Sequence, residues 1–357
     1  MKYNLKKKKL WIVLILTVLF FVVLYRTKNS QREIGSENFS LSRAMDSLLT
    51  SVTPTPFPFQ ELTIPYLRNR NYQSALGTMD QAYETTNYIG YLTSYNSDGL
   101  KINGLLTIPK GETPSGGWPA IVFLHGYIPP TQYQTLERYT DYVDYIARNG
   151  FVVFKVDLRG NGQSEGMPGG AYYSSDYIID TLNAYAALAS SNLINPQKIG
   201  LWGHSMAGNV VLRSFAVKPD IPAVVIWAGA GYTYLDLRQY RISDASYRPP
   251  QLITQRSRDR QRLNDLYGSP SAESTFWQQV APTNYLTDLK GAIQLNHAAD
   301  DDVVSVEYSR NLNQLLNETA VIHEFNEYES GGHNITGASF TQAMQKTVEF
   351  FKKYLGE

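Results

Sequence analysis

One stretch constrains the fold of this 357-residue chain more than any other: residues 198–211, KIGLWGHSMAGNVV. Its apolar run 199–202 has the character of a buried strand, whereas the apolar residues beyond Ser205 recur at near-helical spacing. A strand that turns into a helix over Gly-x-Ser-x-small holds its serine in a strained turn, and small neighbours let the two backbones approach closely. Ala207 stands where a second glycine is usual; because Gly208 follows at once, we expect the turn to be intact.

The segments around this turn predict an α/β fold. Strand-forming residues 88–96 and 100–109 flank Ser97, Asp98 and Gly99, which indicates an antiparallel β-hairpin at the start. After it, short apolar runs alternate with helical segments, which favours a mostly parallel sheet with helices on both faces. The expected strands are 120–125, 151–157, 223–229, 292–297 and 321–328, and the expected helices are 139–149, 177–190 and 340–355.

Between residues 232 and 285 the alternation of strands and helices stops. This segment carries several tyrosines, a Pro249–Pro250 pair and seven arginines from Arg238 to Arg262. An insertion after a central strand predicts a cap, or lid, over the site. Residues 256–262, where Asp259 is interleaved with the arginines, suit the solvated face of a helix. The alternative is a positively charged lid that selects an anionic substrate.

The N-terminus predicts a membrane anchor over residues 1–28. Five lysines precede an unbroken apolar run 10–25, and no small-x-small cleavage site follows it. The run is shorter than the hydrocarbon core, roughly 30 Å thick, so the flanking lysines and arginines would complete the span. The positive-inside rule then leaves the N-terminus in the cytoplasm and the catalytic domain extracytoplasmic. A cleaved signal peptide is the alternative.

Residues 29–71 are polar and then proline-rich at 53–59, TPTPFPF. This composition predicts an extended linker rather than a folded unit. The domain organisation that we expect is therefore an anchor (1–28), a linker (29–71) and a catalytic domain (72–357) with its cap at 232–285.

Composition and spacing exclude several classes of site. The 32 basic and 32 acidic residues cancel, so nothing draws the chain to nucleic acid, and the absence of cysteine excludes disulfides, thiolate metal sites and cysteine nucleophiles. No histidine and carboxylate spacing resembles a zinc or calcium site. Gly160 and Gly162 follow a strand, but a loop continues where a dinucleotide site needs a helix. We expect no metal and no cofactor.

A serine becomes a nucleophile only with a base within hydrogen-bond reach and a carboxylate that orients the base. Among five histidines, His333 lies in the glycine-rich loop ESGGHNI between the last strand and the last helix, where it is free to reach the top of the sheet. The loop after the preceding strand carries Asp300, Asp301 and Asp302. The chain order is thus serine, aspartate, histidine.

Acyl transfer also needs hydrogen-bond donors for the developing oxyanion. The amide of Met206, directly after the serine, is one candidate. The loop after residues 120–125 offers the backbone of Tyr127 as the other, and the Tyr127 phenol is a further candidate. Simple aromatic packing of Tyr127 in the wall of the site is the alternative.

Five segments together carry a family resemblance: FLHGY, DLRGNGQSEG, GHSMAG, DDDVVS and GGH. From about residue 88 to 355 the chain resembles α/β-hydrolases of the prolyl oligopeptidase type, the catalytic domain of S9 serine peptidases, and related esterases. HAADDDVVSVEYSR resembles the family segment H-G-T-x-D-x-V-V-P, which implies Asp301 as the acid, Asp302 as the fallback, and Ser305 in place of the usual proline. In several family members a tyrosine at the Tyr127 position gives its hydroxyl to the oxyanion.

The resemblance implies a serine hydrolase in which Ser205 attacks, His333 is the base, Asp301 orients it, and Met206 and Tyr127 bind the oxyanion; the predicted anchor would hold this hydrolase at a membrane. Its substrates would be small esters or peptides. Two features depart from the larger peptidases of the family: no N-terminal propeller precedes the domain, and no glutamate pair for a free amine is identifiable. The alternative is a catalytically inactive hydrolase fold kept as a binding module, for which Ala207 and Ser305 are the only hints.

Overall fold

The computed structural model describes residues 57–233, 235–240, 242–243 and 250–356. Residues Phe59–Glu357 form one compact unit. The other unit, Met1–Pro58, lies almost wholly outside the described residues, and so do the predicted anchor at 1–28 and most of the predicted linker. Within the described ranges, no helix combines the length and the apolar character needed to cross a bilayer.

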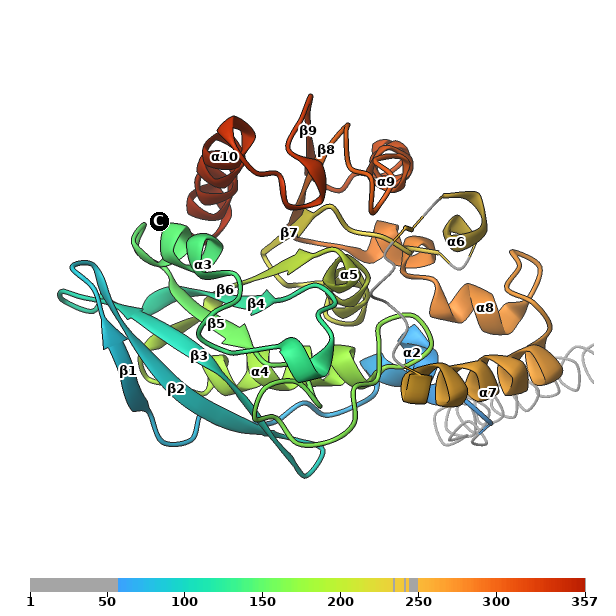
Figure 1. Cartoon of the computed structure of the whole chain (residues 1–357), viewed down its shortest axis with the longest axis horizontal. Helices are drawn as coiled ribbons and strands as arrows, with labels where there is room; N and C mark the ends of the chain where they lie inside the picture. The colour runs from blue at the N-terminus through green and yellow to red at the C-terminus, as the bar shows by residue number, and fades with distance from the viewer. Residues whose placement is uncertain (1–56, 234, 241, 244–249, 357) are drawn as a thin grey trace, which may run out of the picture. The chain divides into compact units, whose positions relative to one another are not determined.

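A single nine-stranded sheet organises this unit, in the order β1-β2-β3-β5-β4-β6-β7-β8-β9 (Figure 1). The first three strands and the β3–β5 pair are antiparallel, and all pairs from β5 to β9 are parallel. The prediction of a mostly parallel sheet with an antiparallel start is confirmed. The strands are β1 Asp80–Glu84, β2 Tyr88–Ser97, β3 Leu100–Pro109, β4 Trp118–Leu124, β5 Val152–Val156, β6 Ile194–His204, β7 Ala223–Trp227, β8 Ala292–Ala298 and β9 His323–Tyr328.

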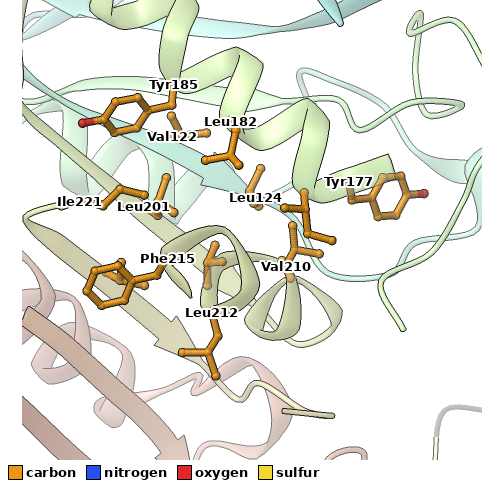
Figure 2. Packing of buried hydrophobic residues seen from close by; sticks show 14 of the residues in the cluster. Val122, Leu124, Tyr177, Leu182, Tyr185, Leu201, Val210, Leu212, Phe215 and Ile221 are labelled. Carbon is orange, nitrogen blue, oxygen red and sulfur yellow. The ribbon is translucent and has the colours of Figure 1, made fainter. Parts of the chain in front are cut away.

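Helices cover both faces of the sheet, as predicted. One face carries α4 Asp176–Ala189, α5 Met206–Val217 and α9 Glu307–Asn317, and the other carries α3 Thr140–Ala147 and α10 Ala338–Leu355. Figure 2 shows the first layer, where side chains of α4 and α5 meet Leu201 of β6 and Leu124 of β4. Strands β5, β7 and β8 are buried along their whole length, because helices pack on both sides of them.

Two elements were not expected from the sequence. The edge strand β1 is mostly exposed and carries only one partly buried residue, so it has no apolar alternation that would reveal it. Helix α9 begins directly after the aspartate-rich loop, and its apolar residues Tyr308, Leu312 and Leu316 are buried against the sheet. It fills the parallel crossover between β8 and β9.

The predicted linker ends too late in the sequence. Residues Gln60–Leu62 form a 3₁₀ turn (η1) and Ile64–Arg68 form helix α2, so the folded unit begins near residue 59 rather than at 72. Leu62, Ile64 and Leu67 are at most 1% exposed. The Arg68 guanidinium donates to the carbonyl of Ala216 at 2.7 and 2.9 Å. Burial of three apolar side chains holds a segment whose polar and proline-rich surroundings resemble a linker.

The cap insertion contains three helices among its described residues: α6 Asp236–Gln239, α7 Pro250–Tyr267 and α8 Thr275–Val280. Leu263, Phe276, Trp277 and Val280 form a small core of their own with Leu62. The arginines of α7 at 258, 260 and 262 are exposed, as the helix-face interpretation predicted. Arg260 and Arg262 lie over the rings of Tyr173 and Phe59, at 5.7 and 5.2 Å, and so attach the cap to the body.

Candidate active site

Ser205 lies at the junction between β6 and α5, where the sequence placed it. Its backbone angles are φ 55° and ψ −119°, a conformation that costs a non-glycine residue about 1–3 kcal/mol. Two hydrogen bonds fix the turn: the Ser205 amide donates to the carbonyl of Trp227 at 2.9 Å, and the Ser205 carbonyl accepts from the amide of Gly208 at 2.8 Å. The strand and the helix together therefore hold the serine at the carboxyl end of the sheet.

The small residues of the turn have different tasks. A Cβ atom on Gly203 would lie 2.7 Å from the carbonyl oxygen of Ala207, and a Cβ on Gly208 would lie 2.6 Å from the Cα of Gly229. Both positions therefore require glycine, because backbone atoms stand in the way. Ala207 is fully buried among apolar side chains of the core. Ala207 therefore fits at the position where a second glycine is usual, and it is the next residue, Gly208, that must be glycine.

Ser205, His333 and Asp301 form one hydrogen-bonded line. The Ser205 Oγ lies 2.9 Å from His333 Nε2, and His333 Nδ1 lies 2.8 Å from Asp301 Oδ2. His333 is in the 3₁₀ turn η4 Gly332–Asn334, between β9 and α10, and its side chain is 15% exposed. Because the Asp301 carboxylate can only accept, Nδ1 of His333 carries the proton and Nε2 is left to accept from the serine hydroxyl.

The Asp301 carboxylate is fully buried and receives four hydrogen bonds. Its Oδ1 accepts from the amides of Val303 and Val304 at 2.9 Å each, and its Oδ2 accepts from His333 and from His297 Nε2 at 3.0 Å. Burial acts to raise the pKa of Asp301, but the hydrogen bonds from His297, His333 and the Val304 amide outweigh it and hold that pKa below its usual range. Asp301 therefore stays ionised.

The two neighbouring aspartates have other positions. Asp300 accepts from the amides of Gly331 and Gly332 at 3.2 and 2.8 Å, so it holds the loop that carries His333. Asp302, the fallback acid, is exposed. Only the middle aspartate of the three lies against the histidine ring.

Of the two loops expected to supply oxyanion donors, one begins at Met206 and the other passes the serine at Gly126, where an added Cβ would lie 3.1 Å from the Cβ of Ser205. Met206 is the first residue of α5, and the first amides of a helix have no partner within the helix. On the other side, the amide of Gly126, directly before Tyr127, donates to the Tyr139 hydroxyl at 2.8 Å. The Tyr127 side chain is half-buried and packs against the main core. This packing agrees with the alternative offered for the Tyr127 side chain from the sequence.

Of the four remaining histidines, His297 and His204 contact Asp301 and His333 respectively. His297 donates from Nε2 to Asp301, and its Nδ1 lies 2.7 Å from Ser309 Oγ. Burial lowers the pKa of His125 to about 4, and its ring lies 4.3 Å from that of Tyr133. His204 lies under the loop of His333. His323 contacts the backbone of Val321 and is outside the site.

Sequence reasoning missed how the oxyanion loop, residues 125–139, is anchored. Asp157, at the end of β5, accepts from the hydroxyls of Tyr133, at 2.6 Å, and Thr135. The ammonium of Lys155 donates to the carbonyls of Thr135 and Arg138. Burial raises the pKa of Asp157 to about 6 and lowers that of Lys155 to about 8. A lysine inside an otherwise apolar strand and an aspartate directly after it were the available signal.

Arg159 pins the loop that follows β5. Its guanidinium binds Asp180 at 2.7 and 2.9 Å and Asp176 at 3.0 Å. These contacts hold the residues after β5 against α4. Among the described residues, no group of three or more histidine, aspartate and glutamate side chains is arranged to hold a metal ion.

The fold and the serine turn agree with comparisons to known proteins. Residues 119–265 match the family model described as serine aminopeptidase, S33. This range runs from β4 through the serine turn into α7 and ends before Asp301 and His333.

The sequence relatives are named for several different activities. A thiohydrolase of Aspergillus aculeatus is 32% identical over 148 residues, which cover 42% of this chain and 43% of the relative. A polyketide transferase of Penicillium crustosum is 30% identical over 120 residues, covering 34% of this chain and 37% of the relative. An uncharacterised peptidase of Bacillus subtilis is 23% identical over 232 residues, covering 64% and 79%. The matched part of this chain spans less than half the length of the first two relatives.

Solved structures share the fold over most of the chain. An acetyl xylan esterase from Paenibacillus sp. R4 superimposes with a TM-score of 0.58 at 16% identity, covering 82% of this chain and 92% of the esterase. An acylaminoacyl peptidase of Pyrococcus horikoshii gives a TM-score of 0.58 at 18% identity, covering 76% and 43%. The chain therefore has the α/β-hydrolase fold, as its motifs predicted. Within that fold, residues 119–265 are similar to the serine aminopeptidase family.

Proposed function

We propose that this protein is a serine hydrolase that cleaves an ester or peptide bond through an acyl-enzyme. One observation carries the proposal: Ser205 Oγ, His333 and Asp301 are joined by hydrogen bonds of 2.9 and 2.8 Å, with the serine at a strained turn. The buried, ionised Asp301 fixes the tautomer of His333 that accepts a proton from the serine. The members of the line come from three separate loops at the carboxyl end of the sheet.

The reaction follows from this geometry. His333 Nε2 takes the proton of Ser205 as Oγ attacks the substrate carbonyl, and the amides of Met206 and Tyr127 stabilise the oxyanion. Each such donor contributes about 2.7–4 kcal/mol to the transition state. His333 then gives the proton to the leaving alcohol or amine, which leaves an acyl ester on Ser205. Water, deprotonated by His333, attacks this ester and releases the acid and the free serine.

A fluorophosphonate probe tests the mechanism. The probe should react with the purified protein, and mass spectrometry should find the adduct on the peptide that contains Ser205. Ser205→Ala should abolish labelling, and His333→Ala should slow it strongly while the protein stays folded. A well-folded wild-type protein that the probe does not label would favour the inactive binding module instead.

Ester and peptide substrates are separated by direct comparison. The comparisons contain esterases and peptidases alike, and the resemblance to the S9 peptidases is a resemblance of fold and motifs. We propose an ester or thioester as the first substrate class to test, because the relatives include a thiohydrolase and the described residues form no propeller that would select peptides. Turnover of aryl acetates above that of aminoacyl and dipeptidyl anilides would support this class; the reverse ranking would assign a peptidase.

We also propose that residues 1–28 anchor the protein in a membrane and leave the hydrolase domain extracytoplasmic. The lysine cluster followed by the apolar run 10–25 supports this proposal. The full chain should remain in the membrane fraction after alkaline carbonate extraction, and protease added outside spheroplasts should digest the domain. Release of the full chain by carbonate, or its protection from protease, would contradict the proposal.

A further inference from the structure

We infer that Tyr139 and His204 are positioning residues: one directed chain of hydrogen bonds through them holds the oxyanion loop and the base His333 in register. The inference rests on the proposed function, since it concerns the same base and the same loop. Neither residue is part of the line Ser205, His333 and Asp301.

Three contacts make up this chain, which we call the relay. The Gly126 amide donates to the Tyr139 hydroxyl at 2.8 Å, the hydroxyl lies 2.7 Å from His204 Nδ1, and His204 Nε2 lies 2.8 Å from the backbone carbonyl of His333. Gly126 follows β4, His204 ends β6, His333 follows β9, and Tyr139 precedes α3. The relay thus connects the ends of three strands with the start of a helix.

The ends of the relay determine the direction of every bond. The His333 carbonyl can only accept, so His204 carries its proton on Nε2 and presents a bare Nδ1. The Tyr139 hydroxyl must then donate to Nδ1, which leaves its oxygen to accept from the Gly126 amide. This assignment needs a neutral His204. Burial, and then the nearby His333, lower the pKa of His204 to about 3, so the imidazole is neutral at physiological pH.

Tyr139 has an unusual backbone conformation for this task. Its φ of 61° and ψ of 24° are left-handed, which is rare for a bulky side chain and persists only where the surroundings impose it. The ring lies edge-on to Phe123 and Trp202, with centroids 5.6 and 6.1 Å away. These contacts direct the hydroxyl toward Gly126 and His204. Enclosure of the hydroxyl also raises the pKa of Tyr139, so it remains a donor.

Each end of the relay fixes a group that the reaction uses. At one end the Gly126 amide is turned toward Tyr139, which sets the orientation of the following peptide and of the Tyr127 amide. At the other end the backbone of His333 is held by His204, while Asp301 holds its ring. The two imidazole rings lie 4.7 Å apart. Loss of the relay should therefore slow the chemical step and leave substrate binding nearly unchanged.

Three substitutions separate the bonds of the relay. Tyr139→Phe removes the hydroxyl and keeps the ring. His204→Gln can keep a donor toward the His333 carbonyl but loses the acceptor for the Tyr139 hydroxyl. His204→Asn can keep that acceptor but loses the donor toward the His333 carbonyl. Tyr88→Phe is the matched control, because this buried tyrosine donates to Asp144 of the same helix α3, at 3.1 Å, and is not part of the relay.

The experiment measures kcat and KM for an aryl acetate, with kcat expressed per active site as titrated by fluorophosphonate labelling. It also measures the second-order rate constant of that labelling. We expect Tyr139→Phe and His204→Asn to lower kcat about 10- to 100-fold at unchanged KM, since each leaves a buried polar group unpaired or frees His333. His204→Gln should lower kcat as well, because it breaks the bond from Tyr139, and Tyr88→Phe should equal the wild type. A smaller labelled fraction with wild-type rates per site would show a merely structural role and overturn the inference.

Nitrogen-15 NMR of histidine tests the relay without any substrate. The wild-type His204 should be a neutral Nε2–H imidazole from about pH 5 to 8, and Tyr139→Phe should shift its Nδ1 resonance. An Nδ1–H tautomer or a protonated His204 would overturn the inference even if the protein hydrolyses nothing. A wild-type protein that shows this tautomer but is not labelled at Ser205 would instead overturn the proposed function alone.

Discussion

Replacing Asp301 by asparagine tests how the buried carboxylate controls the base. The amides of Val303 and Val304 both donate to Oδ1, and only an oxygen can accept them. The asparagine must therefore place its carbonyl oxygen there and turn its NH₂ group toward His333 Nδ1, where Asp301 Oδ2 now accepts at 2.8 Å. Two donors would then face one another.

His333 can resolve this conflict only by changing its tautomer. With its proton on Nε2, it presents a bare Nδ1 to the asparagine, but Nε2 then no longer accepts from Ser205 at 2.9 Å. The general base is lost while the geometry stays almost unchanged. In serine proteases with the same arrangement, the equivalent substitution lowers kcat about 10⁴-fold, or about 5.5 kcal/mol. We expect a loss of this order here.

The assay compares three variants of the same loop. Fluorophosphonate labelling and aryl acetate turnover are measured for Asp300→Asn, Asp301→Asn and Asp302→Asn, with thermal melts to confirm folding. Asp302 is exposed, so its variant is the matched control and should equal the wild type. Asp300→Asn should have a small effect, because an asparagine oxygen can still accept from Gly331 or Gly332. If Asp301→Asn stayed within about tenfold of the wild type, or Asp302→Asn lost as much, the tautomer reasoning would be refuted.

Three further predictions concern stability. Burial raises the folded-state pKa of Asp157 to about 6, so protonated Asp157 contributes to the free energy of unfolding below its unfolded pKa of about 3.9, and this contribution is lost as pH rises through 6. Denaturant unfolding measured from about pH 4 to 6 should show the free energy of unfolding fall, and Asp157→Asn should remove this pH dependence. Gly208→Ala should cost about 1–3 kcal/mol of unfolding free energy, because its Cβ would meet Gly229 at 2.6 Å, whereas Ala207→Gly, the control, should cost at most about 1 kcal/mol. Leu62→Ala should cost about 2–5 kcal/mol; a neutral result would return residue 62 to the linker.

Most of the sheet was predictable because its central strands are buried along their whole length and are rich in apolar residues. Burial on both faces favours short apolar runs, which β7 shows without interruption and β5 shows apart from Lys155. Strand β8 is also buried throughout, although it carries three polar residues. β1 was missed because an exposed edge strand needs no such run. Residues 60–68 were predicted as linker because this buried turn and helix are short and directly follow a polar, proline-rich stretch.

The sequence was enough to identify the candidate reactive groups and their chain order: Ser205 at a strand-to-helix turn, three consecutive aspartates, and His333 in a glycine-rich loop. These features are local, because a strained turn requires small residues at adjacent positions of the sequence. Tertiary structure decided which groups meet. Asp301 lies against His333, while Asp300 holds the loop and Asp302 faces solvent.

Tertiary structure also decided the supporting contacts, which join residues far apart in the chain. The Gly126 amide reaches His333 only through Tyr139 and His204, and Asp157 anchors a loop more than twenty residues earlier. Parallel strands bring their carboxyl ends to one edge of the sheet, but the pairing of side chains there depends on loop paths that no local pattern encodes. The serine turn could be predicted from the sequence, whereas the hydrogen-bond network around His333 could be identified only from the tertiary structure.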